Sequence, residues 1–287
     1  MNPLVTVGLD GTPESLSAAH WAAQEARVRH ATLRLLHAWV LLAAEPATHP
    51  SEADQNYWAE RIVEEARSAV EKRYPDLPIY EDLVAEDPVT ALLAAARESD
   101  MLVLGSRDMA PMASYFLGDV GLHVVARAEA PSVLVRARED SAPLADDGDV
   151  VVALGLRRPS DALFEFAFDS AARRGVTLRA VHGRSLPAPV YTRGGVDPSL
   201  SEAAAKDARR ELTDALRPWR EKYPDVRTVD SVWLESPARA VVRGASGAGL
   251  LVVGRRKNRP ALSPRVGHVL SAAVHHAPCP VAVVPHE

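Results

Sequence analysis

The sequence predicts an α/β protein made of two tandem Rossmann-like, doubly wound domains, each with a five-stranded parallel sheet flanked by helices. The length of 287 residues is about twice the common domain length of about 100–150 residues. Short apolar runs alternate with longer segments of helical periodicity, which is the pattern of a parallel sheet with right-handed crossovers. Landmarks of the first half also recur in the second half, so we expect one fold that is repeated.

Pairs of residues at constant spacing carry this repeat. His37 recurs as His182 and Trp21 as Phe166, in both cases 145 residues later. The later pairs, all 149 residues apart, are Tyr74 with Tyr223, Pro88 with Pro237, Gly105 with Gly254, Gly118 with Gly267, and Pro131 with Pro280. The change in spacing implies a net insertion of four residues, which we place in a longer loop at Arg184–Leu200 of the second copy.

In the first copy, short apolar runs bounded by turn residues predict strands that are covered on both faces. These strands are Leu4–Gly8, Leu33–Val40, Ile79–Val84, Met101–Gly105 and Ser132–Arg136. The segments between them predict helices at Pro13–His30, Asn56–Arg73, Val89–Glu98 and Val120–Ala128. In the first helix, the spacing of Ala19, Ala22, Ala23 and Ala26 predicts a stripe that faces the sheet.

The second copy repeats the order of strands from Val150 onward. Its predicted strands are Val150–Leu154, Thr177–His182, Arg227–Leu234, Leu250–Gly254 and Val281–Pro285. Acidic residues together with Pro143 and Gly148 separate the two copies, a composition that is typical of a solvated linker. We therefore expect a first domain at residues 1–138, an acidic linker at 139–148 and a second domain at 149–287.

Composition narrows the classes of partner and compartment. The formal net charge is -5, which argues against a general grip on nucleic acid or on an anionic membrane. The longest apolar stretch, Ala38–Ala44, is far shorter than the ~18–20 residues that span a bilayer, and the start lacks a basic signal-peptide region. Cys279 is the only cysteine, so no intrachain disulfide can form and a reducing cytoplasm is the expected location.

A ligand site is expected at the carboxyl ends of the strands, where the winding of an open α/β sheet reverses. This rule selects the loops that follow the first and fourth strands of each copy. In the first copy, the loops and their flanks contribute Gly8, Asp10, Gly105, Ser106, Arg107, Gly118, Asp119 and Val120. In the second copy, the matching residues are Gly155, Gly254, Arg255, Arg256, Gly267 and His268.

Two sequence motifs point to a known family. The first is Gly8-Leu9-Asp10-Gly11-Thr12-Pro13, which ends a strand and precedes an alanine-rich helix. The second is Gly105-Ser106-Arg107, whose loop ends in Leu117-Gly118 before a helix and an Ala-Pro-x-Val-Leu-Val strand. Together these motifs resemble the universal stress protein family. The resemblance covers both copies and implies ATP or a related adenine nucleotide as ligand, with Asp10 on the nucleoside and the backbone near Ala38 against the base.

The phosphate loop departs from the pattern of ATP-holding members, which is Gly, two residues, Gly, nine residues, then Gly with Ser or Thr. In the first copy the second glycine is replaced by Asp108 and the hydroxyl residue by Asp119. Asp119 is expected to cap the following helix and to repel phosphate, unless Mg²⁺ bridges the carboxylate and the phosphates. A capped helix with no phosphate site and a metal-assisted site both stay open; no other metal site is predicted.

The second copy reverses these charges. Lys257 and His268 replace the second glycine and the hydroxyl residue, and Arg255 and Arg256 make the loop basic. Phosphate would be attracted to this loop, although such a loop is also compatible with a solvated surface. The residue that matches Asp10 is Gly155, so the nucleoside side lacks its carboxylate. Each copy therefore keeps a different half of the family's site.

Other motifs favour structural roles. His268, His275 and His276 suggest a metal site only weakly, because helical spacing without a carboxylate is typical of a surface helix. Cys279 precedes Pro280 at the start of a strand and is expected to be a core residue. The glycine-rich segment Gly244–Gly249 precedes a strand, whereas a dinucleotide loop must follow one, so it is interpreted as a helix-ending turn.

Three functions are compatible with these observations. The first is a stress-response regulator that binds ATP or a related nucleotide at a degenerate glycine loop, and the second is a nucleotide-independent member that acts through oligomers and protein contacts. The third is an ATP-hydrolysing enzyme, which ranks last because no catalytic residue is identified. The apolar strands Ser132–Val135 and Val281–Val284 end their sheets. We expect them to pair with each other or with a neighbouring chain, giving a pseudo-dimer that forms a homodimer.

Overall fold

The computed structural model describes residues 3–40, 52–106, 119–137, 148–156, 160–186, 191–192, 195–196, 198–257 and 266–287. The chain divides into two compact units, residues 1–142 and residues 143–287. The predicted acidic linker at 139–148 lies outside the described residues except for Gly148. No described helix is long and apolar enough to cross a membrane.

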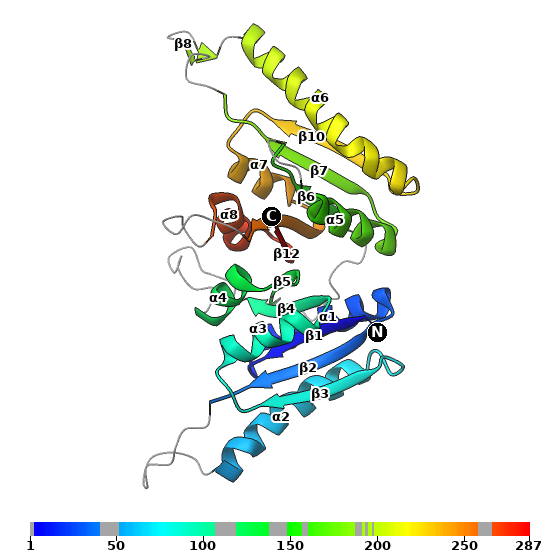
Figure 1. Cartoon of the computed structure of the whole chain (residues 1–287), viewed down its shortest axis with the longest axis vertical. Coiled ribbons are helices and arrows are strands. Elements are labelled where there is room, and N and C mark those ends of the chain that lie inside the picture. The colour runs from blue at the N-terminus through cyan, green and yellow to red at the C-terminus, as the bar shows by residue number, and fades with distance from the viewer. Residues whose placement is uncertain are drawn as a thin grey trace. The chain divides into compact units, whose positions relative to one another are not determined.

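In its described part, unit 1 holds five parallel strands in the order β5-β4-β1-β2-β3. The strands are β1 (Leu4–Leu9), β2 (Thr32–Ala38), β3 (Ile79–Val84), β4 (Met101–Ser106) and β5 (Ser132–Arg136). The helices are α1 (Pro13–Arg29), α2 (Glu52–Glu71), α3 (Pro88–Glu98) and α4 (Asp119–Arg127). Helices α1 and α2 cover one face of the sheet, and α3 and α4 cover the other (Figure 1). The chain leaves β1 toward β2 and later crosses to β4, so the winding reverses between β1 and β4.

Unit 2 repeats this arrangement, with the order β12-β11-β6-β7-β10 among its described parallel strands. The strands are β6 (Asp149–Ala153), β7 (Leu178–Gly183), β10 (Thr228–Trp233), β11 (Ala248–Arg256) and β12 (Val281–His286). The helices are α5 (Asp161–Arg174), α6 (Pro198–Lys222), α7 (Pro237–Gly244) and α8 (His268–His276). Helices α5 and α6 cover one face, and α7 and α8 the other (Figure 1). Two tandem doubly wound α/β domains were predicted, and the structure confirms them.

The prediction of a plain loop at Arg184–Leu200 is wrong. Within it, β8 (Tyr191–Thr192) and β9 (Gly195–Val196) form a small antiparallel pair, and α6 already begins at Pro198. The sequence carried both signals. Two residues that include Gly194 separate the two short strands, and glycine is favoured in tight hairpin turns. Proline is favoured in the first turn of a helix, where a backbone N–H would have no partner within the helix.

The two units pack their first helices with side chains of different size. In α1, the predicted alanine stripe is confirmed, since Ala19, Ala22, Ala23 and Ala26 are fully buried. At the matching place, unit 2 has a set of stacked aromatic rings. These are Phe164 and Phe168 of α5 with Trp219 of α6 and Tyr223, which directly follows α6, at centroid distances of 5.5–6.5 Å. The two copies therefore share a topology but not a core.

The close approach of α1 to β4 requires glycine at position 105. A Cβ atom built on Gly105 would lie 2.7 Å from the Glu14 carbonyl carbon and 2.7 Å from the Ser15 amide nitrogen. Both contacts are with backbone, which cannot move aside as a flexible side chain can. The first turn of α1 therefore lies directly on the end of β4.

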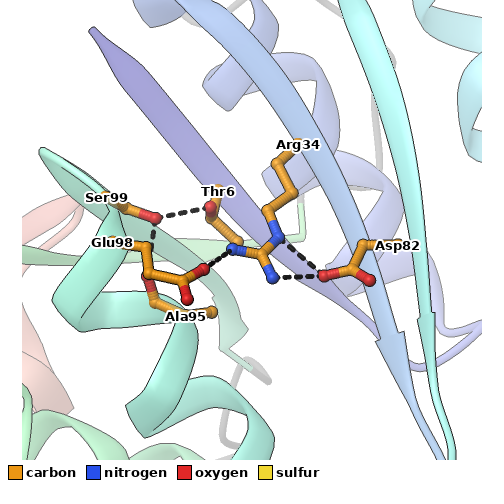
Figure 2. Close-up of polar contacts among 6 residues, drawn as sticks. All are labelled: Thr6, Arg34, Asp82, Ala95, Glu98 and Ser99. Carbon is orange, nitrogen blue, oxygen red and sulfur yellow. Dashed lines mark hydrogen bonds and ion pairs between the residues drawn. The ribbon is translucent and has the colours of Figure 1, made fainter. Parts of the chain in front are cut away.

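A polar network fastens α3 to the sheet of unit 1 (Figure 2). Arg34 on β2 donates from Nε to Asp82 of β3 at 2.7 Å and from Nη1 to Glu98 of α3 at 2.8 Å. Ser99 donates to the Ala95 carbonyl at 2.7 Å, so its hydroxyl accepts from buried Thr6 at 2.7 Å. The network holds the end of α3 while its first residue, Pro88, borders the cleft described below.

Strands β5 and β12 each lie at one end of their own unit's order of strands. Their pairing with each other or with a second chain stays a prediction. Cys279 is buried, as expected of a core residue. In the glycine-rich segment, Gly244 ends α7, a turn follows at residues 245–247, and Gly249 already belongs to β11, so the predicted helix-ending turn is confirmed.

Candidate functional site

A cavity of about 310 Å³ opens at the carboxyl ends of β1 and β4 in unit 1, and we call it the first cleft. The apolar part of its wall includes Leu36, Leu92 and Leu104, next to Ala38 at the end of β2. The polar part comes from the β1–α1 turn, with Asp10 and Thr12, and from the first turn of α1, with Glu14 and Ser15. The position agrees with the rule that ligands of doubly wound sheets bind where the strand order reverses.

Asp10 is held in place by the start of α1. Its Oδ1 accepts from the Thr12 amide at 3.0 Å and from the Thr12 hydroxyl at 2.5 Å. Thr12 in turn caps α1, because its Oγ1 accepts from the Ser15 amide at 3.2 Å. The turn passes through Gly11 at a φ of 77°, a left-handed value that glycine adopts without steric cost. Among the described residues, Asp10 Oδ2 accepts no hydrogen bond, and the side chain is exposed.

The other predicted residues of the first copy fall into three groups. Gly8, Ala38, Gly105 and Val120 border the first cleft with Asp10. Ser106 is buried at the end of β4 and does not border it. Arg107 and Gly118 lie outside the described residues, and Asp119 begins α4 without a described side chain. The replaced glycine position, Asp108, is also outside the described residues.

Unit 2 has a cavity of about 280 Å³ at the equivalent place, which we call the second cleft. Gly155 and Gly254 border it as predicted, together with Arg256. A Cβ atom built on Gly155 would meet nothing within 4 Å, so the space of the missing carboxylate is open. Three other predicted residues do not border the second cleft. Arg255 is only 5% exposed, and from the start of α8 the cavity is bordered by Val269 and not by Gly267 or His268.

Two histidines of the second cleft were missed as site residues. His182 Nδ1 lies 2.8 Å from the Leu154 carbonyl, which can only accept, so Nδ1 carries the proton and Nε2 is left for another partner. His37 makes the same bond to the Leu9 carbonyl, also at 2.8 Å. His286 packs on Gly254, where a built Cβ would lie 2.8 Å from its Nε2. The repeat identified His37 and His182 only as landmarks, and His286 has Ala137 as its counterpart.

The charged side chains of the two clefts differ in sign. In the described wall of the first cleft, the charged residues are Asp10 and Glu14. In the described wall of the second cleft, the charged residue is Arg256, accompanied by His182 and His286. The described residues hold no group of three His, Cys, Asp or Glu side chains suited to a metal ion. The side chains of Asp108 and Asp119 lie outside the described residues, so the metal-assisted site stays a prediction.

The sequence profile of the universal stress protein family matches residues 1–136 and 148–285. The chain belongs to the universal stress protein family. A universal stress protein of Mycobacterium tuberculosis is 32% identical over 97% of this chain and 96% of its own length. One from Mycolicibacterium smegmatis is 28% identical over 98% of this chain and 96% of its own length. The crystal structure of a universal stress protein from Archaeoglobus fulgidus shares the fold, with a TM-score of 0.71 at 15% identity over 99% of this chain and 98% of that chain.

Proposed function

We propose that this universal stress protein is a stress-response regulator whose first cleft binds an adenine nucleotide or nucleoside through its nucleoside part. The observation that carries the proposal is the anchored carboxylate of Asp10 beside an apolar slot. The choice of adenine follows from the resemblance of the Gly8 to Pro13 motif to family members that hold ATP.

Asp10 is suited to hold the ribose. Ribose hydroxyls are donors, and a carboxylate supplies only acceptors. Because Thr12 already fixes Oδ1, the side chain loses little conformational freedom when Oδ2 accepts from a hydroxyl. Preorganisation of this kind raises affinity by lowering the entropy cost of binding.

The base is placed against the apolar side of the first cleft. Leu36, Leu92 and Leu104 provide a surface on which a flat ring buries its faces, and Ala38 leaves the end of β2 open to it. The volume of about 310 Å³ lies at the lower end of the about 300–1,000 Å³ of small-molecule sites. A nucleoside fills such a space without further opening.

In the first cleft, we expect the phosphate groups of a nucleotide to contribute less binding free energy than its nucleoside part. The start of α4 borders the cleft through Val120, and the partial positive charge of a helix start favours an anion. Asp10 and Glu14 oppose it, since two like charges ~4 Å apart repel by about 1–4 kcal/mol between water and an effective dielectric of 20. We therefore expect that, without a divalent cation, adenosine binds at least as tightly as ATP.

Binding rather than catalysis is proposed because both hydroxyls of the described wall are committed to the start of α1. The Thr12 oxygen caps the helix by accepting from the Ser15 amide, while its hydroxyl donates to Asp10. Ser15 donates from Oγ to the Thr12 carbonyl at 2.9 Å, so its proton is directed to the start of α1 and not to a general base. A nucleophile needs a base within hydrogen-bond reach.

The substitution Asp10→Asn tests the proposal. Asparagine keeps an oxygen for Thr12 and removes the charge, so α1 stays capped. Calorimetric titration of the full chain with adenosine is expected to show an affinity loss of about tenfold or more, because hydrogen bonds to charged groups contribute about 1.5–3 kcal/mol. Asp76→Asn is the matched control, since Asp76 is exposed before β3, at the opposite end of the sheet.

Ribose recognition gives a second readout. The wild-type protein should prefer adenosine over its 2′- and 3′-deoxy forms, and this preference should shrink in Asp10→Asn. Equal losses in Asp10→Asn and Asp76→Asn would refute the placement of the nucleoside. No adenosine binding by the wild type would favour the nucleotide-independent class, which acts through oligomers and protein contacts.

A further inference from the structure

We propose that the second cleft is a separate binding site for a small organic anion, a carboxylate or a phosphate carried on an apolar body, and that it does not recognise ribose. Every described residue that borders the second cleft belongs to unit 2. The proposal therefore holds whether or not the first cleft binds adenosine.

Arg256 and His286 form the anion-binding end of the second cleft. They are register partners on β11 and β12, and both border the cavity. The strand pair is fixed just beyond them, since the Lys257 amide donates to the His286 carbonyl at 2.7 Å. Arg256 carries a permanent positive charge on a planar group that donates two parallel hydrogen bonds to a carboxylate or a phosphate. Its side chain is exposed at the mouth, where it can meet an arriving ligand.

The described wall of the second cleft includes neither Asp nor Glu. His286 Nδ1 lies 2.8 Å from the main-chain oxygen of Glu287, which leaves Arg256 as the charged group that faces an anion. At the position where the first cleft has Asp10, Gly155 leaves open space. The loss of this carboxylate removes both the repulsion of an anion and the acceptor that a ribose diol would need. One replacement therefore favours an anion and disfavours a nucleoside.

The remaining wall suits an apolar body. Leu154, Leu156, Val181 and Val241 border the cavity, as does the buried Phe164. Apolar side chains around a few polar groups are the usual lining of a small-molecule site. On β7, which β6 separates from β11, His182 also borders the cavity and offers Nε2 because its Nδ1 is held by the Leu154 carbonyl.

The start of α8 adds to this charge pattern but does not carry the inference. Its N-cap is Gly267, which makes no side-chain hydrogen bond to the helix, and Val269 of the first turn borders the cavity. By contrast, α5 of the same unit is capped by Ser160. The helix dipole at α8 has the sign that Arg256 has, so both attract an anion.

Calorimetric titration of the full chain with phenyl phosphate, benzoate and neutral benzyl alcohol tests the proposal. At least one of the two anions should bind, and which one binds identifies the anionic group. Arg256→Gln should weaken that binding by about tenfold or more. Arg239→Gln, which makes the same charge change on α7 at a side chain that is 82% exposed, should leave it unchanged.

A second pair of variants tests the missing carboxylate. Gly155→Asp should weaken anion binding by about tenfold or more, whereas Gly155→Asn, of the same size without the charge, should stay within about threefold of wild type. Asp10→Asn in unit 1 should not change it. The proposal is overturned by benzyl alcohol binding as tightly as the anions, by an unchanged affinity in Arg256→Gln, by equal affinities in the two Gly155 variants, or by no binding of either anion. A failure here leaves the adenosine titration of the first cleft untouched, and the reverse also holds.

Discussion

Replacement of Gly105 by alanine is expected to loosen the first cleft, and the size of the effect follows from the contacts at this position. The added Cβ would lie 2.7–2.8 Å from backbone atoms of Glu14 and Ser15, several tenths of an ångström inside normal contact. Relief requires the first turn of α1 to move away from β4. Overpacking of this kind costs about 1–3 kcal/mol, which outweighs the about 0.4–1 kcal/mol that Gly→Ala gains by restricting the unfolded chain.

The matched control is Gly155→Ala in unit 2. A Cβ built there meets nothing within 4 Å, and Gly155 is not among the glycines with positive φ. We expect its stability to be unchanged or raised by up to about 1 kcal/mol. Native-state hydrogen exchange with mass spectrometry, on the full chain, separates the two units by peptide. An unchanged opening free energy of the α1 and β4 peptides in Gly105→Ala would refute the close approach of α1 to β4.

Two further substitutions probe unit 1. Arg34→Met should lower the stability of unit 1 by about 2 kcal/mol, which is below the about 3–5 kcal/mol for a fully buried pair because the side chain of its partner Asp82 is 24% exposed. The control, Arg179→Met in unit 2, should lower stability by less, because the Arg179 side chain is itself 24% exposed. Equal stability losses in the two variants, measured by hydrogen exchange, would contradict the role of the network. Burial and the charge of Arg73 lower the pKa of His20, so the unfolded chain binds more protons and stability should fall as pH drops below about 6.5. His20→Gln should flatten this dependence in urea unfolding between pH 7.5 and 5.5, and an unaltered slope would count against the assignment.

The fold could be predicted from the sequence because local patterns and the repeat agree. Short apolar runs mark the buried parallel strands, and the alanine stripe from Ala19 to Ala26 marks a helix that packs on β1 and β4. The prediction disagreed with the structure in the segment at residues 184–200, where the only local pattern was a weak turn signal inside a long connection. Such signals depend on few residues and lack the support of a periodic face.

Residues of the candidate site could be predicted only where their position depends on a single strand and the turn that follows it. Asp10 and Gly105 follow from the ends of strands, and the structure places both at the first cleft. Arg255 and Arg256 are not equivalent, because successive side chains of a strand point to opposite faces, so one is buried and the other borders the second cleft. His286 could not be recognised, since its contact with Gly254 depends on the register of β11 with β12.

The central claim is that two copies of one fold hold clefts of opposite chemistry. Hydrogen exchange of the full chain, measured with adenosine and separately with phenyl phosphate, tests it most directly because the same sample reports both units. Adenosine should protect only peptides of unit 1 that border the first cleft, including Asp10, and phenyl phosphate only peptides of unit 2 that border the second cleft, including Arg256. Protection of both units by one ligand, or of the same unit by both ligands, would contradict the claim.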